Sequence, residues 1–310
     1  MKQRVLVVSS ANIDLVQRMK RVPASGETFL ETESAPQFTP GGKGANSAVA
    51  FARMGVDTVF CTRIGKDANG ARLRALYEKE KIDTRFVFAD SARATGLASI
   101  LVEESGSNRI IVYPGANLAL SADDVEEAMT CLPDAVYLQF EVPDEPVLAA
   151  AKFAAEKHIP LFVDAGPARA DFPLEALGEV EIFSPNETET FVYTGIHPNT
   201  QDNCLRAAIR LASRVKAKYI VLKLGSRGSF LYDGKFFHVI PAVEMEVADT
   251  TAAGDVFTAA LVSQYMAGEG IVDAARFATY AAAISVSRPG AYPSIPTFAE
   301  TAALIRERES

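Results

Sequence analysis

The stretch DTTAAGDVFTAALV, residues 249–262, decides how we interpret the rest of this 310-residue chain. Its first half consists largely of small residues, so the backbone there can approach a ligand closely. Its second half is apolar and predicts a long helix that begins near Gly254. The first N–H groups of a helix lack intrahelical partners and point at whatever lies in front of them. The stretch therefore predicts an anion site at the start of this helix.

Asp255 lies in the first turn of the same helix, beside the predicted anion site. A carboxylate in this position could accept the proton of a hydroxyl that is held next to the anion. Together, an anion site and a base predict phosphoryl transfer to an alcohol. Taken alone, Asp255 also has an ordinary interpretation, because an acid in the first turn of a helix stabilises the helix dipole.

Composition narrows the classes of protein to be considered. Hydrophobic residues make up 48% of the chain and charged residues 23%, which is typical of a globular protein with a large core. The net charge of −8 argues against nucleic acid as a partner and favours a neutral substrate. The sequence shows neither a signal-peptide pattern nor a membrane span, so we expect no membrane contact and a cytoplasmic location. Cys61, Cys131 and Cys204 lack metal spacing and are interpreted as reduced thiols.

Strand and helix patterns alternate along most of the chain and predict one α/β domain over residues 1–310. We expect a central, mostly parallel sheet flanked by helices, with strands at residues 4–10, 58–64, 85–88, 135–140, 160–163, 180–183 and 219–224. Asn12 and Asp14 follow the first strand, where ligands bind in open α/β sheets. These two side chains could accept sugar hydroxyls, or they could simply form a turn.

The string GGKGAN, residues 41–46, opens an amphipathic helix that is expected to run to Met54. The paired glycines Gly41 and Gly42 would let a sugar ring lie against the backbone, while Asn46 could bond a hydroxyl from the side. The alternative is a tight loop with Lys43 on the surface. The string is not a phosphate-binding P-loop, because the glycine spacing before Lys43 is wrong and no Ser or Thr follows it.

A second, smaller sheet is predicted outside the core. Residues 95–103 and 109–113, joined by a turn at 104–108, read as a β-hairpin. We expect this hairpin to pair with a short strand at residues 28–33. The resulting sheet, from segments at about 14–40 and 93–118, would be a lid that excludes water from the sugar.

Two of these stretches resemble a known family. Residues 249–262 resemble the second signature of the PfkB carbohydrate kinases, and GGKGAN followed by SAVAFARMG resembles the first, in the form typical of its ribokinase branch. The resemblance implies a ribokinase-like fold and ATP-dependent phosphorylation of the primary hydroxyl of a sugar, most readily D-ribose to D-ribose 5-phosphate. It implies that Asp255 is the catalytic base and that the backbone of Ala253 and Gly254 forms the anion hole. It also implies a homodimer formed through the lid.

The same resemblance assigns the remaining site residues. The sugar would be held by Asn12, Asp14, Gly41, Gly42, Lys43, Asn46, Glu141 and Asp255. ATP would contact Asn186, Lys223, Gly225, Ser226, Gly228, Gly254 and Thr279. Asn186 and Glu189 match the family's NxxE motif and would hold Mg²⁺ through water, although acids at a helix start more commonly serve the dipole. K⁺ or a similar ion would bind among Asp249, Thr251, Ser285, Arg288, Gly290 and Ser294.

Three departures from the ribokinase pattern keep the substrate open. Asp164 stands in DAGPAR where NPAPAR is expected, Lys223 replaces a threonine, and Thr279 replaces a histidine. Kinases of the same family that act on deoxyribose, a ketohexose or a nucleoside therefore remain alternatives. An NAD-dependent oxidoreductase is disfavoured because no GxGxxG follows the first strand. A sugar sensor without catalysis is disfavoured by Asp255 and by residues 186–189.

Overall fold

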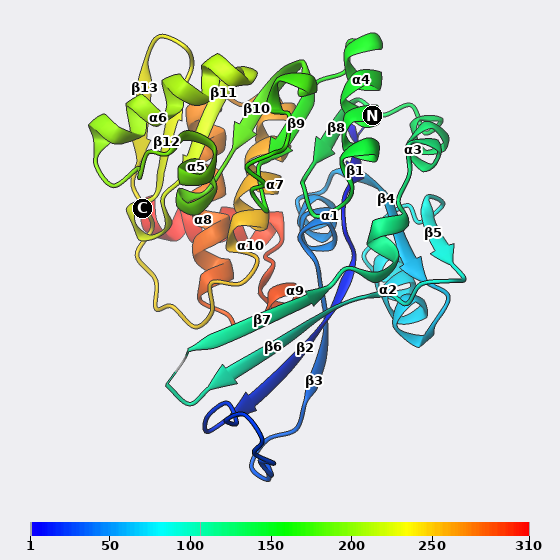
Figure 1. Ribbon diagram of the computed structural model, residues 1–310. Helices are drawn as coiled ribbons and strands as arrows, with labels where there is room; N and C mark the ends of the chain where they lie inside the picture. The colour runs from blue at the N-terminus through cyan, green and yellow to red at the C-terminus, as the bar shows by residue number, and fades with distance from the viewer. Residues whose placement is uncertain (1, 106, 310) are drawn as a thin grey trace.

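The computed structural model describes residues 2–105 and 107–309. A nine-stranded sheet forms its larger part, with strand order β13-β12-β11-β10-β9-β8-β1-β4-β5 (Figure 1). All neighbouring strands from β11 to β5 pair in parallel, whereas β12 and β13 are antiparallel additions at one edge. The strands are β1 (Arg4–Val8), β4 (Asp57–Gly65), β5 (Val87–Asp90), β8 (Ala135–Leu138), β9 (Leu161–Asp164), β10 (Glu179–Ser184), β11 (Lys216–Lys223), β12 (Ser229–Tyr232) and β13 (Phe237–Ile240). The predicted central sheet is confirmed.

Helices cover both faces of this sheet. One face carries α1 (Lys43–Arg53), α2 (Ala68–Lys79), α7 (Ala253–Met266) and α8 (Ile271–Val286), and the other carries α3 (Ala122–Met129), α4 (Asp144–Glu156), α5 (Glu187–Thr194) and α6 (Gln201–Arg214). The chain ends with α9 (Ala291–Ser294) and α10 (Phe298–Glu309), which packs on α8. Val5 and Val7 of β1 join the core under α7, while Leu6 and Val8 join the core under α4. Burial on both faces explains why the strand is continuously apolar.

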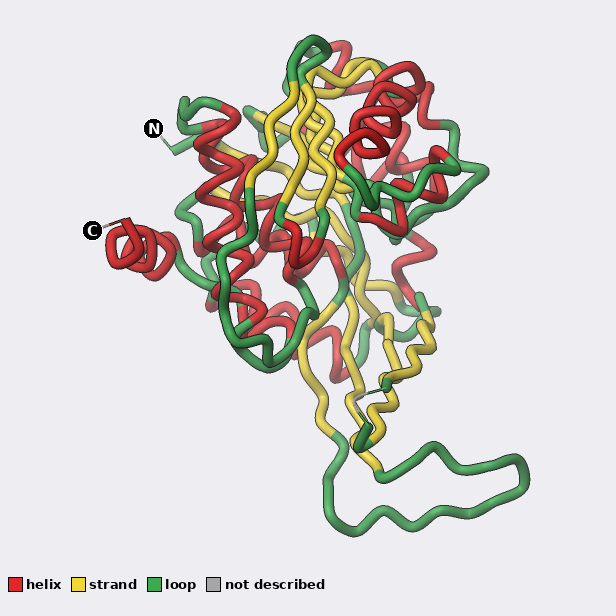
Figure 2. Tube along the Cα trace, turned by 90° about the vertical axis from the view of Figure 1, so that its left-hand side faces the viewer, coloured by secondary structure: helices red, strands yellow, loops and turns green. Residues whose placement is uncertain are grey.

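The small sheet has the order β3-β2-β6-β7 and projects from one end of the large sheet (Figures 1 and 2). Its strands are β2 (Asn12–Met19), β3 (Gln37–Gly41), β6 (Gly96–Glu103) and β7 (Asn108–Tyr113). The predicted hairpin is confirmed as β6 and β7. Residue 106, in its predicted turn, and the terminal residues 1 and 310 lie outside the described residues.

The predicted strand at residues 28–33 is wrong, because this segment has no regular structure. Its apolar residues Phe29 and Leu30 are adjacent and cannot share one face of a strand, and Leu30 is 83% exposed. The partner of β6 is instead β2, which follows β1 almost directly and pairs with β6 in parallel from Asn12 to Met19. Asn12 and Asp14 therefore lie in a strand, not in the loop or turn that the sequence suggested.

The carboxyl ends of β1, β8, β9, β10 and β11 all lie at the same edge of the large sheet. Because β2 continues from β1, the small sheet lies at this edge as well (Figure 1). Helix α1 also begins here, where the backbone N–H of Ala45 donates to the carbonyl of Ser10. The topology thus gathers residues that are far apart in sequence. None of the helices within residues 2–105 and 107–309 is both long and apolar enough to span a bilayer.

Candidate active site

Asp255 lies at the centre of this edge, in the first turn of α7, and is only 5% exposed. The side-chain amide of Asn46 donates to Asp255 Oδ2 at 2.9 Å, and that of Gln139 donates to Oδ1 at 3.2 Å. Burial raises the pKa of Asp255 to about 6, although the positive charge of Lys43 opposes this shift. A carboxylate with such a pKa is ionised at neutral pH and is still a competent proton acceptor. A surface acid that only stabilises the helix dipole would need neither this burial nor two amide donors.

The helix that carries Asp255 begins with an unusual backbone conformation. Ala252 has a φ of 66°, in the left-handed region that residues with a Cβ adopt at a cost. No side chain caps this helix start. The Ala253 N–H donates to the Thr250 carbonyl at 3.3 Å, whereas the Gly254 N–H is not used by a capping side chain, as an anion hole requires.

Two further carboxylates surround the predicted sugar position. Burial, together with the negative charges of Glu141 and Asp255, raises the pKa of Asp14 to about 7. Glu141 accepts hydrogen bonds from the Ser10 hydroxyl and, at 3.1 Å, from the backbone N–H of Lys43. Asp255 raises the pKa of the half-buried Lys43 ammonium above its ordinary value. The site thus combines several hydroxyl acceptors with one cation that stabilises them.

The paired glycines are required by close contacts across this site. A Cβ on Gly41 would lie 2.1 Å from Asp14 Oδ2, so any side chain there would displace the carboxylate. Gly42 has a φ of 90°, and a Cβ on it would lie 2.8 Å from the backbone nitrogen of Asn12. The structure therefore brings Asn12, Asp14, Gly41 and Gly42 together.

Two site residues were missed by the sequence analysis. Gln139, fully buried after β8, accepts from the Ser9 hydroxyl at 3.0 Å and donates to Ser47 at 3.3 Å as well as to Asp255. Its signal was a lone amide in the apolar run AVYLQF. Asn117, in the short 3-10 helix Gly115–Ala119, donates to Asn12 Oδ1 at 2.7 Å and so fixes the orientation of the Asn12 amide. No sequence pattern marked Asn117.

Two of the sequence departures, Lys223 and Asp164, contact each other. Lys223, at the end of β11, donates to Asp164 Oδ1 at 2.7 Å and to the Thr258 hydroxyl at 3.2 Å. The Thr258 hydroxyl donates in turn to Asp164 Oδ2 at 2.9 Å. A Cβ built on Gly254 would lie 3.7 Å from Lys223 Nζ. The Lys223 ammonium therefore lies beside the first turn of α7.

Asn186 and Glu189 form a reciprocal capping box at the start of α5. Asn186 Oδ1 accepts from the Glu189 N–H at 2.8 Å, and Glu189 Oε2 accepts from the Asn186 N–H at 2.7 Å. Burial raises the pKa of Glu189, while the nearby Lys223 and Lys43 lower it. Among residues 2–105 and 107–309, no group of three or more His, Cys, Asp or Glu side chains is placed to hold a metal ion. A magnesium ion held through water requires few direct protein ligands, and the amide and carboxylate oxygens of these two residues would suit that role.

The predicted cation loop lies beyond the N-terminus of α7. Asp249 Oδ1 accepts from the N–H and the hydroxyl of Thr251, and its Oδ2 accepts from the Gly290 N–H at 3.0 Å. The buried hydroxyls of Ser285 and Ser294 lie 3.0 Å apart. Oxygen atoms from several segments thus meet here, which fits a large, weakly hydrated cation. The guanidinium of Arg288 instead pairs with Glu300 at 2.6 Å, so only its backbone could take part.

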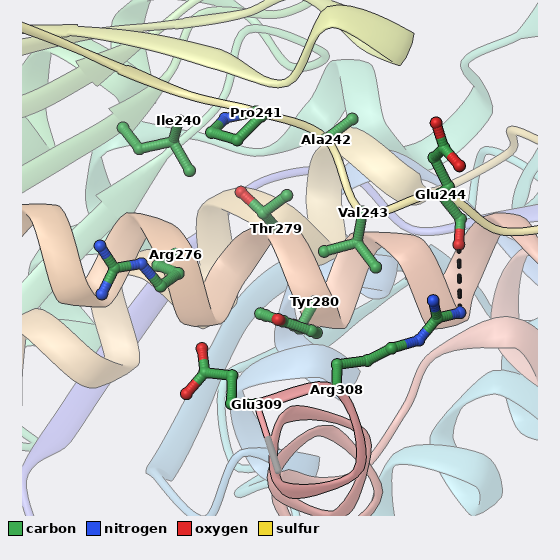
Figure 3. Close-up of a pocket in the computed structure, with 10 residues that line it drawn as sticks. All are labelled: Ile240, Pro241, Ala242, Val243, Glu244, Arg276, Thr279, Tyr280, Arg308 and Glu309. Carbon is green, nitrogen blue, oxygen red and sulfur yellow. Dashed lines mark hydrogen bonds between the residues drawn. The ribbon is translucent and has the colours of Figure 1, made fainter.

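The loop after β11 contains a 3-10 turn, Gly225–Arg227, and the left-handed Gly228. Thr279, on α8, donates its hydroxyl to the Ala275 carbonyl at 2.9 Å and lines a cavity of about 390 Å³ between the segment after β13, α8 and α10 (Figure 3). Asp255 and the two residues that bond it, Asn46 and Gln139, do not line this cavity. Of the predicted nucleotide contacts, Gly254 and Lys223 lie at the first turn of α7, Thr279 lines this cavity, and the others lie at the start of α5 and in the loop after β11.

Comparison with known proteins agrees with this geometry. Residues 2–298 match the pfkB family carbohydrate kinases, and the chain belongs to this family. The predicted family, α/β fold and enzyme class are thereby confirmed.

Ribokinases are prominent among its relatives. The chain is 33% identical over 303 residues to the ribokinase of Staphylococcus aureus (strain COL), an alignment that covers 97% of this chain and 99% of that protein. It is 31% identical over 303 residues to the deoxyribokinase of Salmonella typhi, covering 96% and 97% of the two chains. The structure of Arabidopsis thaliana ribokinase complexed with ribose and ATP aligns with a TM-score of 0.90 and 32% identity over 99% of each chain.

Proposed function

We propose that this chain is an ATP-dependent sugar kinase that converts D-ribose to D-ribose 5-phosphate. The observation that carries the proposal is the position of Asp255, a buried carboxylate in the first turn of α7 that Asn46 and Gln139 hold by both oxygens. The similarity to ribokinases from other organisms supports ribose as the sugar.

Asp255 would act on the primary hydroxyl of the sugar. An alcohol is too weak an acid for a carboxylate to ionise it beforehand, so Asp255 orients the hydroxyl and takes its proton as the new oxygen–phosphorus bond forms. The bond between the terminal phosphorus and its bridging oxygen breaks at the same time and releases ADP. The N–H groups at Ala253 and Gly254 stabilise the charge on the transferred group.

The other hydroxyls of the sugar would be held by the acceptors around Asp14. Asn12, Asp14 and Glu141 provide oxygen acceptors, while Lys43 and Asn46 provide donors. The backbone at Gly41 and Gly42 leaves room for the ring. A neutral polyol suits this arrangement, because each of its hydroxyls can donate a hydrogen bond to one of these acceptors.

The nucleotide would extend from the first turn of α7 past residues 225–228, with adenine in the cavity at Thr279. When bound, magnesium supplies positive charge at the ATP phosphates. Asn186 and Glu189 would hold it through water. The oxygen atoms around Asp249 and residues 285–294 would hold K⁺. Its charge would add to the positive potential at the N-terminus of α7 and so favour the anionic phosphoryl group.

Ribose-dependent release of ADP, with and without potassium, tests the proposed function. We expect release that requires ribose and magnesium and that increases when potassium is added. A panel of ribose, deoxyribose, a ketohexose and a nucleoside identifies the preferred acceptor. Preference for deoxyribose, which the relative from Salmonella typhi makes the second candidate, would overturn the assignment to ribose alone. The absence of ADP release with every acceptor would overturn the kinase proposal.

The small sheet would serve as the lid over the sugar and as the contact between two copies of the chain. Among the strands that the structure describes, β7 pairs with β6 alone, and its residues Ile110, Ile111, Val112 and Tyr113 are exposed. An exposed apolar edge strand favours association with another chain. We therefore include a homodimer formed through the small sheet in the proposal.

A further inference from the structure

The contact between Lys223 and Asp164 is a buried ion pair at a point where charge matters. Their side chains are only 11% and 2% exposed. A buried charge is costly to leave unpaired, so each residue requires the other. An uncharged pair would avoid this cost, which makes the presence of both charges here informative.

The geometry leaves part of the lysine available for a ligand. A lysine ammonium has three N–H donors, and within the part of the chain that the structure describes two of them are directed at Asp164 and Thr258. Thr258 and Gly254 lie on the same turn of α7, where the Thr258 hydroxyl also contacts the Gly254 carbonyl at 3.1 Å. The ammonium is therefore fixed beside the N-terminus of the helix that carries Asp255.

We propose that Asp164 is a positioning residue which, with Thr258, holds the Lys223 ammonium beside Gly254, where its third N–H contacts the phosphoryl group during transfer. This inference rests on the proposed kinase function and deepens it. Asp164 itself does not contact the reacting atoms. It orients the cation, and its negative charge balances that cation when no nucleotide is bound.

The pair also acts on Asp255 without changing the net charge around it. Lys223 lowers the pKa of Asp255 and Asp164 raises it, so the two effects oppose each other. Other groups that face Asp255 are present in every variant: Asn46 and Lys43 on α1, Tyr137 on β8, Gln139 after β8, and Asp14 on β2. Loss of one member of the pair should therefore displace the acid limb of the pH profile, and loss of both should restore it.

A double-mutant cycle tests the proposal. Lys223→Met should lower kcat about 100-fold, leave the KM for ribose nearly unchanged and move the acid limb to higher pH. Asp164→Asn should lower kcat about 10-fold and move the limb to lower pH. In the double variant the limb should return, and kcat should exceed the product of the two single effects at least 10-fold, because contacting residues do not act additively.

Further variants separate positioning from folding. Thr258→Val keeps both charges and the shape of the side chain, and it should lower kcat several-fold without moving the acid limb. Lys218→Met is the matched control, because Lys218 lies on the same strand and forms an exposed ion pair with Glu181. It should leave all parameters unchanged. Melting temperatures show which variants fold.

The outcomes are distinguishable. A wild-type protein without sugar kinase activity contradicts the proposed function. If the wild type is active but the single effects are additive and the acid limb does not move, the role of Asp164 is contradicted. The proposed function then still stands. If the double variant does not fold, the opposite limb shifts of the two single variants and the effect of Thr258→Val decide the question. Equal limb positions in the two single variants would then refute the proposal.

Discussion

At the scale of single residues, the site depends on carboxylates that the fold buries, although burial disfavours their ionised form. Asp255 and Asp14 both have a raised pKa, mainly because burial disfavours the ionised form. Asn46 and Gln139 satisfy the oxygens of Asp255 and hold them in a fixed orientation. Burial of these acids lowers the stability of the ligand-free protein but prepares it for hydroxyl binding.

Replacement of Asp255 by Asn should remove the base and keep the shape of the side chain. We expect kcat to fall at least 1,000-fold, in line with the loss of a general base, while ribose binding measured by calorimetry changes little. Asp273→Asn is the matched control, because Asp273 also lies in the first turn of a helix but is exposed. Near-normal turnover in Asp255→Asn would contradict the assigned role.

Replacement of Asp14 by Asn should stabilise the ligand-free protein in a pH-dependent way. The ordinary pKa of 3.8 rises to about 7 in the folded state, so folding favours the protonated acid. This contribution to stability is complete below pH 3.8 and is lost as the pH rises through about 7. The loss is gradual between pH 3.8 and about 7, so the difference in Tm between variant and wild type should be small near pH 4 and at least about 2 °C at pH 8.

Scanning fluorimetry across this range measures the difference directly. Asp273→Asn again serves as the control and should show a small and constant difference. If the difference in Tm between Asp14→Asn and wild type does not grow with pH, burial does not raise the pKa of the Asp14 carboxylate.

At the scale of elements, one helix start can serve two purposes. The capping box of Asn186 and Glu189 satisfies backbone groups of α5, which was the commoner interpretation of these residues. The same carboxylate faces the charges of Lys223 and Lys43. The two interpretations are compatible, so only a change that separates hydrogen bonding from charge can distinguish them.

Glu189→Gln makes that separation. Glutamine can still cap the helix, so Tm should stay within about 2 °C of wild type. Loss of the charge should raise the magnesium concentration needed for half-maximal activity about 10-fold. Glu189→Ala, which loses the cap as well, should also lower Tm. An unchanged magnesium requirement in Glu189→Gln would leave Glu189 with a structural role only.

Local patterns predicted the elements that carry strong periodic signals. The glycines before α1, the small residues before α7 and the apolar parallel strands each have a local physical cause, and the structure contains them. The strand β2 was missed because Asn and Asp usually mark turns, and here tertiary pairing with β6 overrides that preference. The left-handed Ala252, the amide of Asn117 and the Lys223–Asp164 contact depend on distant neighbours, which a single sequence does not reveal.

At the scale of the whole molecule, two sheets meet at one edge and the site lies between them. The large sheet supplies Gln139, Glu141, Asp164 and Lys223 at or just beyond its carboxyl ends, and the small sheet supplies Asn12 and Asp14. The site therefore depends on the relative position of the sheets as well as on each sheet alone. The exposed side chains of β7 lie at the outer edge of this arrangement.

Ile110→Asp should convert the proposed dimer to a monomer, because a charge would replace an apolar contact on β7. Size-exclusion chromatography with light scattering measures the mass. Val239→Asp is the matched control, since Val239 is a similarly exposed residue on β13, one of the two edge strands of the large sheet. It should leave the mass unchanged. A monomeric wild type, or a dimer that persists in Ile110→Asp, would contradict the proposed contact.

The continuity of β2 joins these scales. A single strand carries Asn12 and Asp14 at its beginning, holds β3 along one side and β6 along the other, and ends at Met19. Backbone hydrogen bonds to the neighbouring strands make such a strand stiff along its length, so its two ends are mechanically coupled. If the small sheet tilts as a unit, the Asp14 carboxylate moves with it, and a sugar bound to this carboxylate would in turn restrict movement at the far end of the strand.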